Sequence, residues 1–419
     1  MRRALAATLA LGVLAALPAI AGTATPAGAR VPPPEVRFST FNASLNRNAE
    51  SQIATDLATP GNAQADAVAE IVQRVRPDVL LINEFDYVTA DPMGPVDDLR
   101  DNYLEVAHGP PEDRTEPIEY PFAYIAPSNT GVPSGLDLNN DGTVGGPNDA
   151  LGFGFFPGQF GMLVLSQYPI VTEDVRTFRD FRWADMPGAR LPDDPATPAA
   201  ADFYSAEELA VLPLSSKSHW DVPIDIDGRI VHFLVSHPTP PAFDGPERRN
   251  KLRNADEIRF WADYIAPGRR SAYIYDDEGV TGGLPMGTPF VIAGDQNSDP
   301  LDGDSESGAI QQLLDHNRID ASLPPESAGA VEASALQGGI NFTHESDPRF
   351  DTADFNDNPA PGNLRVDYVL PSTQLRPIGG GVFWPVQADP LSRLTGTFPF
   401  PSSDHRAVWL DVVVRPGTR

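Results

Sequence analysis

Strand-like segments of this chain repeatedly end at a polar or acidic residue. Segments rich in β-branched and aromatic side chains lead into Asn42, Glu84, His237, Asp295 and Asp367, and Asp404 and His405 precede the last such segment. Carboxylates are the ligands that hard cations such as Mg²⁺ and Ca²⁺ prefer, and histidine changes its charge near neutral pH. Residues of these types can bind a metal ion and transfer protons, provided that the fold brings them together.

Each of these motifs carries little weight alone. An Asn or Asp that follows a strand is usually a turn or cap residue. A histidine on a strand usually satisfies a hydrogen bond in the core. The order of the motifs, and the position of Asn297 two residues after Asp295, are more informative than any one of them.

The elements that must position these residues alternate between strand and helix patterns. Strand-like runs cover residues 36–41, 79–82, 122–125, 161–165, 222–226, 230–235, 290–293, 366–370 and 407–414. Apolar residues recur at three- and four-residue spacing in residues 63–75, 247–265 and 308–315. The mixture predicts an α/β protein with a largely antiparallel core.

Long segments rich in Pro, Gly and Asp interrupt this pattern. They cover residues 87–120, 127–158, 184–215, 276–288 and 322–362. Strand-like runs lie on both sides of each segment, and none has the length of a linker between two cores. We therefore interpret them as insertions within one domain of residues 30–419, and expect function to depend on such loops.

Residues 1–29 have the pattern of a secretory signal peptide. Arg2 and Arg3 precede an apolar run from Ala4 to Ile20, and small residues follow as far as Ala29. A membrane anchor is the alternative, but the run contains Pro18 and is shorter than the roughly 20 apolar residues of a typical span. We expect a secreted protein, and no later stretch is apolar enough to span a bilayer.

The composition is acidic and lacks cysteine. The chain has 58 Asp and Glu against 30 Lys and Arg, a formal net charge of −28 at pH 7, and Lys217 and Lys251 are its two lysines. Proteins that bind phosphate backbones without sequence preference use clustered Lys and Arg. This composition disfavours non-specific polyanion binding. An exported chain without disulfides must be held by its core, with bound ions as a further source of order.

Taken in order, the motifs from Asn42 to His405 resemble the endonuclease/exonuclease/phosphatase family, which includes pancreatic-type deoxyribonuclease and abasic-site endonucleases. The resemblance covers about residues 36–414. It implies a four-layer α/β/β/α sandwich, with two mixed, mostly antiparallel sheets flanked by helices and with long loop insertions. It also implies hydrolysis of a phosphoester by an in-line water, with Mg²⁺ or Mn²⁺ as the catalytic metal.

The resemblance implies a metal site at Asn42, Glu84 and Asp404. Glu84 is the expected carboxylate ligand, and Asn42 is expected to supply a neutral oxygen close to it. Abasic-site endonucleases carry an acidic residue two places after the strand-end Asn, where this chain has Ser44. That additional ligand is therefore not expected here.

The resemblance also implies roles for the residues expected at the reacting phosphate. Asp295 matches the residue that orients and deprotonates the attacking water, and Asn297 matches a hydrogen-bond donor to phosphate oxygens. His237 and His405 match groups that stabilise the transition state or protonate the leaving oxygen. Asp367 matches the carboxylate partner of His405, and such a partner raises the pKa of a histidine.

The segment that begins at Lys217 gives a second group of candidates. Deoxyribonuclease-like members carry a basic residue near this point that contacts phosphate, and Lys217 or His219 could have that role; an ordinary strand start is the alternative. His237 is followed by Pro-Thr-Pro-Pro, closer to those members than to abasic-site endonucleases. An extracellular nuclease is therefore an alternative within the same class.

One insertion contains a sequence similar to a calcium-binding loop. Asp137, Asn139 and Asp141 provide oxygen donors at positions 1, 3 and 5, and a glycine follows for the turn. Position 12 is an Asn rather than a Glu, with Asp149 next to it. We expect a structural Ca²⁺ here, and an Asx/Gly turn in an acidic loop is the alternative.

The expected partner is a phosphoester substrate, and the sequence leaves open whether this is a small molecule, a lipid or a nucleic acid. The charge favours a small or lipid substrate. We expect a monomer. A contrasting hypothesis is a non-catalytic, calcium-binding surface module that has kept the fold; it conflicts with the presence of every expected catalytic residue.

Overall fold

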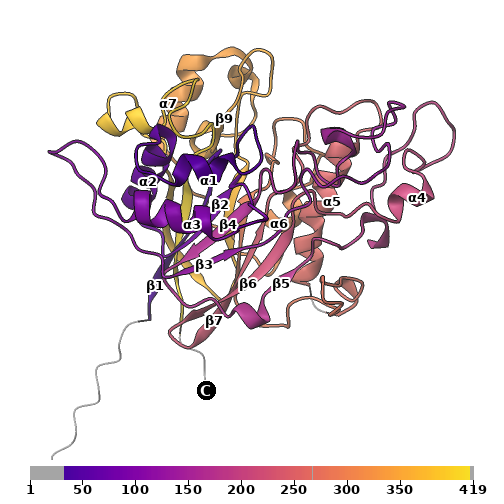
Figure 1. Ribbon diagram of the computed structural model, residues 1–419, viewed down its shortest axis with the longest axis horizontal. Helices are drawn as coiled ribbons and strands as arrows, with labels where there is room; N and C mark the ends of the chain where they lie inside the picture. Colours follow the sequence, from indigo (N-terminus) through magenta and orange to yellow (C-terminus); the bar gives the residue numbers. More distant parts are fainter. Residues whose placement is uncertain (1–32, 267, 416–419) are drawn as a thin grey trace, which may run out of the picture. The chain divides into compact units, whose positions relative to one another are not determined.

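Two mixed β-sheets form the centre of the protein, as the computed structural model of residues 33–266 and 268–415 shows (Figure 1). The expected signal peptide, residues 1–29, lies outside the described residues. The first sheet has the strand order β12-β13-β1-β2-β4-β3. Its strands are β1 (Glu35–Asn42), β2 (Val79–Asn83), β3 (Phe122–Ile125), β4 (Met162–Ser166), β12 (Arg376–Val382) and β13 (Val408–Val413).

The second sheet has the order β11-β8-β7-β6-β5. Its strands are β5 (Arg176–Thr177), β6 (His219–Ile226), β7 (Arg229–Ser236), β8 (Phe290–Asp295) and β11 (Asp367–Pro371), and a separate short pair is β9 (Ala353–Asp354) with β10 (Asn363–Leu364). In each large sheet one neighbouring pair is parallel, β1 with β2 and β7 with β8, and the other neighbours are antiparallel. A parallel pair needs a long crossover, and helices lie in both crossovers.

The helices are α1 (Gln52–Leu57), α2 (Ala63–Val75), α3 (Gly94–Leu99), α4 (Ala206–Leu209), α5 (Arg249–Tyr264), α6 (Gln311–Leu314) and α7 (Ala328–Gln337). The crossover from β1 to β2 contains α1 and α2, and the crossover from β7 to β8 contains α5. Asn62 caps α2 by accepting a hydrogen bond from the Ala65 N–H at 3.1 Å, and Arg76 ends it in the left-handed region at φ 52°. These local signals set the limits of α2.

Alternating side chains of the strands divide the core into three layers. In β2, Leu80 and Ile82 pack against α1, α2 and α3, whereas Val79 and Leu81 face the second sheet. In β8, Ile292 packs against α5. Because successive strand side chains point to opposite faces, both sheets are apolar on both sides, and a one-residue slip would exchange the faces.

The four-layer α/β/β/α fold expected from the sequence is confirmed. Helix 63–75 has the expected limits, and every expected strand is present with ends shifted by a few residues. No helix in the described part of the chain is long and apolar enough to cross a membrane.

Several elements were not among those expected from the sequence, namely α1, α3, α4, α7, β5, β9, β10 and β12. Two of them, β12 and α7, show the physical reason. Strand β12 lies at the edge of its sheet beside β13 and contains a proline and three consecutive glycines, which are poor strand formers. Helix α7 lies in the segment 322–362 and consists largely of Ala, Gly and Ser, so it lacks an apolar stripe. It packs by close approach instead, because a Cβ at Gly329 would lie 1.9 Å from the Trp384 carbonyl oxygen.

Candidate active site

Strand ends from both sheets meet at one edge of the sandwich. In the first sheet Asn42 is paired with Asn83, the residue before Glu84. In the second, Asp295 at the end of β8 is paired with Asp367 at the start of β11. The Asn42 Nδ2 atom lies 3.1 Å from both Glu84 Oε1 and Asp295 Oδ2. The Asn42 amide therefore joins the two sheets at their common edge.

Asp295 is at the centre of this cluster. Its Oδ2 atom lies 3.1 Å from Asn42 Nδ2, 3.4 Å from His237 Nε2 and 3.6 Å from His405 Nε2. Burial alone would raise the pKa of Asp295, but the charge of His405 and the hydrogen bond from His237 outweigh it and hold the pKa below its ordinary value. Asp295 is therefore a buried carboxylate that stays ionised at neutral pH.

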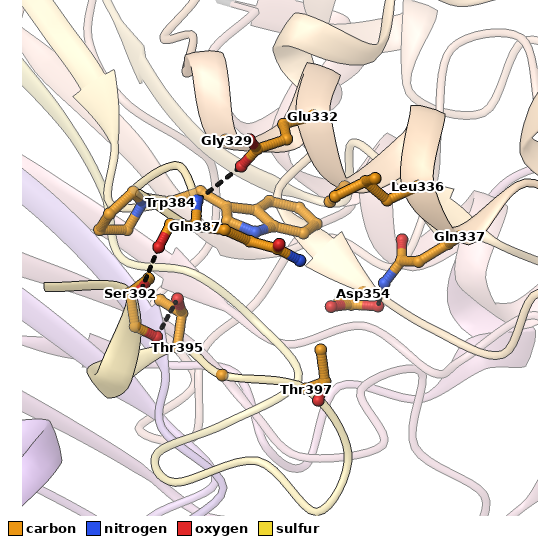
Figure 2. Close-up of a pocket in the computed structure, with 13 residues that line it drawn as sticks. Gly329, Glu332, Leu336, Gln337, Asp354, Trp384, Gln387, Ser392, Thr395 and Thr397 are labelled. Atoms are coloured by element: carbon orange, nitrogen blue, oxygen red, sulfur yellow. Dashed lines mark hydrogen bonds between the residues drawn. The ribbon is translucent and has the colours of Figure 1, made fainter. Parts of the chain in front are cut away.

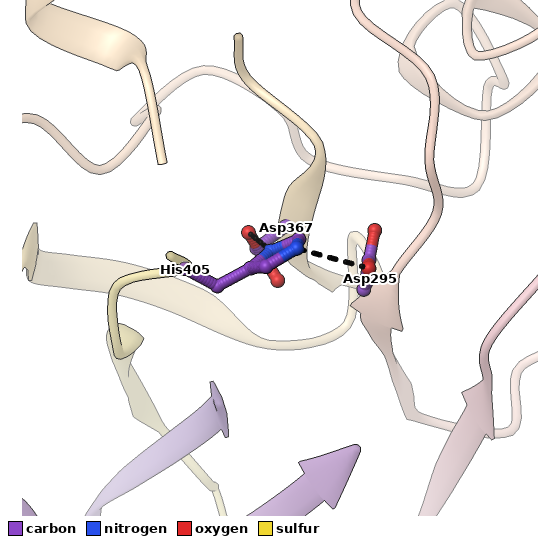
Figure 3. A group of neighbouring side chains, drawn as sticks. All are labelled: Asp295, Asp367 and His405. Carbon is purple, nitrogen blue, oxygen red and sulfur yellow. Dashed lines mark hydrogen bonds and ion pairs between the residues drawn. The ribbon is translucent and has the colours of Figure 1, made fainter. Parts of the chain in front are cut away.

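His405 is held by a second carboxylate (Figure 3). Its Nδ1 atom donates to Asp367 Oδ2 at 2.9 Å, and the Thr352 hydroxyl donates to the same oxygen at 2.8 Å. Burial lowers the pKa of His405, but Asp367 and Asp295 together raise it well above its ordinary value. His405 is therefore protonated, and its Nε2–H is directed toward Asp295.

His237 has the opposite charge state. Its side chain is 3% exposed, and burial, with the nearby Lys217 ammonium, lowers the pKa of His237 to about 4 despite the attraction of Asp295. His237 is therefore neutral at pH 7. Two histidines that flank one carboxylate thus differ in protonation, which is a feature of sites that move protons.

Glu84 and Asp404 form an acidic pair at the same edge. Burial, followed by repulsion from Asp404, raises the pKa of Glu84 to about 7. A carboxylate whose charge is opposed by burial and by a second carboxylate suits a divalent cation, which would neutralise the charge of both. The Glu84 backbone is in the left-handed region at φ 62°, a strained conformation for a residue with a Cβ and one that is enriched at functional sites.

A second set of atoms also has the spacing of a metal site. One ligand atom each from Asp295, Asp367 and His405 lies within 4.8 Å of the others. His405 and Asp367 are already bonded to each other, and a protonated imidazole cannot be a ligand. The hydrogen bond between His405 and Asp367 therefore suits these residues to proton transfer. The carboxylate oxygens of Glu84 and Asp404 are better suited to bind a cation.

Comparison with known proteins agrees with this geometry. The sequence profile described as Endonuclease/Exonuclease/phosphatase family matches residues 39–405. The chain belongs to this family. Members of the family are generally phosphoester hydrolases that use divalent metals. No curated protein matches the chain significantly in sequence.

Solved structures show distant similarity of fold. An endonuclease/exonuclease/phosphatase from Beutenbergia cavernae DSM 12333 is 15% identical, with a TM-score of 0.46, covering 91% of this chain and 72% of that one. Sphingomyelinase C from Streptomyces griseocarneus is 13% identical, with a TM-score of 0.43, covering 90% and 99%. TDP2 from Caenorhabditis elegans is 14% identical, with a TM-score of 0.40, covering 91% and 74%. Similarity at this level says nothing about the substrate.

Two residues expected at the site by family resemblance have specific orientations. Asn42 presents its Nδ2 to both carboxylates, and its Oδ1 accepts from the Ser44 N–H at 3.2 Å. In this orientation it is a hydrogen-bond donor, and its amide would have to turn to offer oxygen to a metal. Asn297 has φ 51°, its N–H donates to Asp295 Oδ1 at 2.9 Å, and its Nδ2 donates to the Pro238 carbonyl at 3.1 Å. It thus connects the Asp295 loop to the His237 loop.

The structure separates the two candidates near β6. Lys217 is buried and lines the same cavity as Glu84 and His237. Burial lowers the pKa of Lys217, and the nearby carboxylates of Glu257, Glu84 and Asp295 counteract this. His219 instead lies in the core, where it bonds Ser215 Oγ and the Glu257 carbonyl through its two ring nitrogens. The structure therefore does not bring His219 into the site.

The expected calcium loop is closed by hydrogen bonds from its own backbone. Asp137 accepts from the N–H groups of Asp141 and Gly142 at 3.1 and 2.8 Å, and Asp149 accepts from those of Asn139 and Gly145 at 3.3 and 2.8 Å. The four acidic and amide side chains named by the sequence therefore belong to one turn. Calcium at this turn stays a prediction.

Two residues that support the site have no role assigned from the sequence. The Asn83 Oδ1 accepts from the Asp295 N–H at 3.2 Å and so joins β2 to β8. The Thr352 hydroxyl holds Asp367 and also accepts from the Val366 N–H at 3.0 Å. Asn83 stands beside a recognised motif, whereas Thr352 lies in an insertion and has no local signal.

A separate cavity of about 190 Å³ lies beside α7 and Trp384 (Figure 2). Its carboxylates already have partners. Asp354 accepts from Arg406 at 3.0 Å, and Glu332 accepts from the Gln387 N–H at 2.6 Å. These contacts give the cavity a structural role in fixing α7.

Proposed function

We propose that this protein is a divalent-metal-dependent hydrolase of phosphoester bonds. The observation that carries the proposal is the environment of Asp295, an ionised buried carboxylate that contacts a neutral and a protonated histidine and lies beside the acidic pair Glu84 and Asp404. Such a group can accept a proton from water while neighbouring donors bind the anionic ester.

In this proposal the residues of the chain have separate tasks. Asp295 Oδ2 accepts the proton of the attacking water, and the Asn42 amide keeps that oxygen in place. His405 donates through Nε2, as hydrogen-bond donor to the phosphate and as proton donor to the leaving oxygen. Asp367 keeps His405 charged, and neutral His237 contributes a hydrogen bond without adding charge.

Two further residues bind the substrate charge in this proposal. The Lys217 ammonium and the Asn297 amide contact phosphate oxygens, where a buried cation and a neutral donor bind an anion favourably. Glu84 and Asp404 would hold Mg²⁺ or Mn²⁺, with Asn42 close by. The ion would neutralise charge that develops on the phosphate and the leaving group.

A turnover assay with matched variants tests this function. The purified protein is incubated with Mg²⁺, Mn²⁺ or Ca²⁺ and a panel of simple phosphomonoesters and phosphodiesters. We expect metal-dependent hydrolysis that falls at least about 100-fold in Asp295→Asn and His405→Gln, whereas the exposed-site variant Asp174→Asn keeps full activity. Absence of hydrolysis across the panel with all three metals contradicts the proposal.

We also propose export directed by residues 1–29. This rests on the charge and apolar pattern described above. Edman sequencing of the protein recovered from culture medium would be expected to begin close to residue 30. A protein retained in the cell with an intact N-terminus contradicts export.

A further inference from the structure

A large cavity extends away from the catalytic edge. Its volume is about 650 Å³, within the range of sites that hold small organic ligands. Glu84, Lys217 and His237 line one part of it. Glu84 is the residue assigned above to the metal, and Lys217 and His237 are assigned to the substrate. The cavity is therefore continuous with the place where the phosphoester would react.

Much of the remaining lining is apolar, and two insertions supply part of it beside the loop that follows β7 and the start of α5. Leu138, Ala150 and Phe153 belong to segment 127–158, and Tyr204 and Leu212 belong to segment 184–215. These segments pack their apolar side chains around a space rather than filling it. An apolar wall next to a charged catalytic end suits a ligand with the same two parts.

Two arginines, of which Arg253 is buried and Arg249 half-buried, hold this wall in place. Arg253, itself 9% exposed, donates through Nε to the Leu214 carbonyl at 2.8 Å and through Nη2 to the Leu151 carbonyl at 2.7 Å. Arg249 donates to the Leu138 carbonyl at 3.2 Å. Both arginines lie on α5, so one helix fixes the two insertions, and the cavity is formed before a ligand arrives.

Polar atoms in the lining add capacity for hydrogen bonds. Ser216 and Thr239 line the cavity, and within the described part of the chain their hydroxyls and the His237 Nδ1 have no hydrogen-bond partner. Buried polar atoms normally have partners.

Two exposed phenylalanines mark the opening. Phe153 and Phe243 line the cavity and are 51% and 97% exposed. Phe243 is held at φ 59°, an unusual backbone conformation for an aromatic residue. Because both side chains also line the cavity, they provide contact area for an apolar group that enters it.

We propose that this cavity binds an apolar organic group carried by the phosphoester, so that the substrate is a small amphiphilic phosphoester. The inference rests on the proposed function and specifies its substrate class. A nucleic-acid backbone fits poorly, because it needs a basic surface and the chain has 30 basic against 58 acidic residues. The group could belong to a soluble ester or to a lipid, since both present apolar carbon next to a phosphate.

Two pairs of compounds test the inference. Methyl and hexyl p-nitrophenyl phosphate share one leaving group, so the ratio of their kcat/KM values measures the effect of the longer alkyl chain. Methylphosphonate and hexylphosphonate give the same comparison for binding by calorimetry. Because a fully buried methylene contributes a gain of about fourfold, we expect at least a tenfold advantage for the hexyl compound in both assays.

Variants of cavity residues test whether the advantage of the hexyl compound arises in the cavity. The double variant Phe153→Ser/Phe243→Ser and, separately, Ala242→Asp in the wall should each reduce the hexyl advantage at least about threefold. The control Phe342→Ser/Phe398→Ser removes two phenylalanines that are 72% and 85% exposed and do not line the cavity, and it should keep the advantage.

The outcomes separate the two proposals. Hydrolysis of the methyl ester without a hexyl advantage overturns this inference and leaves the proposed function standing. A hexyl advantage in binding without hydrolysis of either ester overturns both. Faster cleavage of a single-stranded oligonucleotide than of the hexyl ester, or an equal loss in the control, also overturns the inference. Hydrolysis of phosphatidylcholine vesicles supports it with a lipid source, and hydrolysis confined to the soluble ester supports it with a small-molecule source.

Discussion

Replacing Glu84 by Gln should stabilise the metal-free protein while it removes metal binding. A carboxyl whose pKa rises from 4.5 to about 7 keeps its proton longer in the folded than in the unfolded chain. The free energy of unfolding therefore falls as pH rises through this window. The full difference corresponds to about 3 kcal/mol above pH 7, an upper bound because Glu84 is partly open to the cavity.

Urea denaturation at several pH values measures this effect. In EDTA at pH 8 we expect Glu84→Gln to unfold with about 2–3 kcal/mol more free energy than wild type, and the difference should shrink toward pH 4.5. Added Mg²⁺ or Mn²⁺ should stabilise the wild type and not the variant. The control Glu173→Gln, at an exposed residue, should change neither quantity. A variant less stable than wild type at pH 8, or equal stabilisation of both by metal, refutes the assignment of Glu84.

Three further outcomes follow from particular contacts. Thr352→Val should lower kcat about tenfold or more with little change in KM, because Asp367 loses a hydrogen bond; an unchanged kcat contradicts that positioning role. Burial lowers the pKa of His219 from 6.5 to about 3, so the stability that this neutral group contributes above pH 6.5 is lost as pH falls toward 3. The variant His219→Gln should therefore flatten the dependence of unfolding free energy on pH between 6 and 4. An unchanged slope contradicts this role of His219. Millimolar Ca²⁺ should raise the melting temperature of the wild type but not of Asp137→Asn/Asp141→Asn, and an equal rise in both rejects the calcium loop.

The sequence contained most of the information for the fold. The runs around β1, β2 and β8 are apolar on both faces, which is what a sheet covered by helices on one side and by a second sheet on the other requires. Strand β12 and helix α7 could not be predicted because their glycines and small residues are selected by close packing against β13 and Trp384. That packing exists only in three dimensions.

The sequence indicated which residues lie together in the candidate site, but not which of them are protonated. Motif order indicated Asp295, His237 and His405, yet nothing local shows that His405 is protonated while His237 is neutral. That difference depends on Asp367 being 2.9 Å from one histidine and on the burial of the other. His219 is a residue that the sequence indicated wrongly. Its motif suggested contact with phosphate, but the structure places it among aromatic side chains of the core.

The large cavity could not be predicted at all. Its lining combines insertions with no clear secondary structure, and their common attachment to α5 depends on side-chain contacts of Arg253 and Arg249. Loops of this kind vary independently of the catalytic motifs. The residues of the candidate site can therefore be predicted from the order of the motifs, whereas the cavity beside them requires the structure.

The central claim is that Asp295 activates a water molecule for attack on phosphorus. Hydrolysis of a phosphodiester in ¹⁸O-labelled water, followed by ³¹P NMR, tests it most directly. We predict one ¹⁸O atom in the phosphate product and none in the released alcohol, with product formation lost in Asp295→Asn. Label in the alcohol, or a normal rate of labelled phosphate formation by Asp295→Asn, would contradict the account.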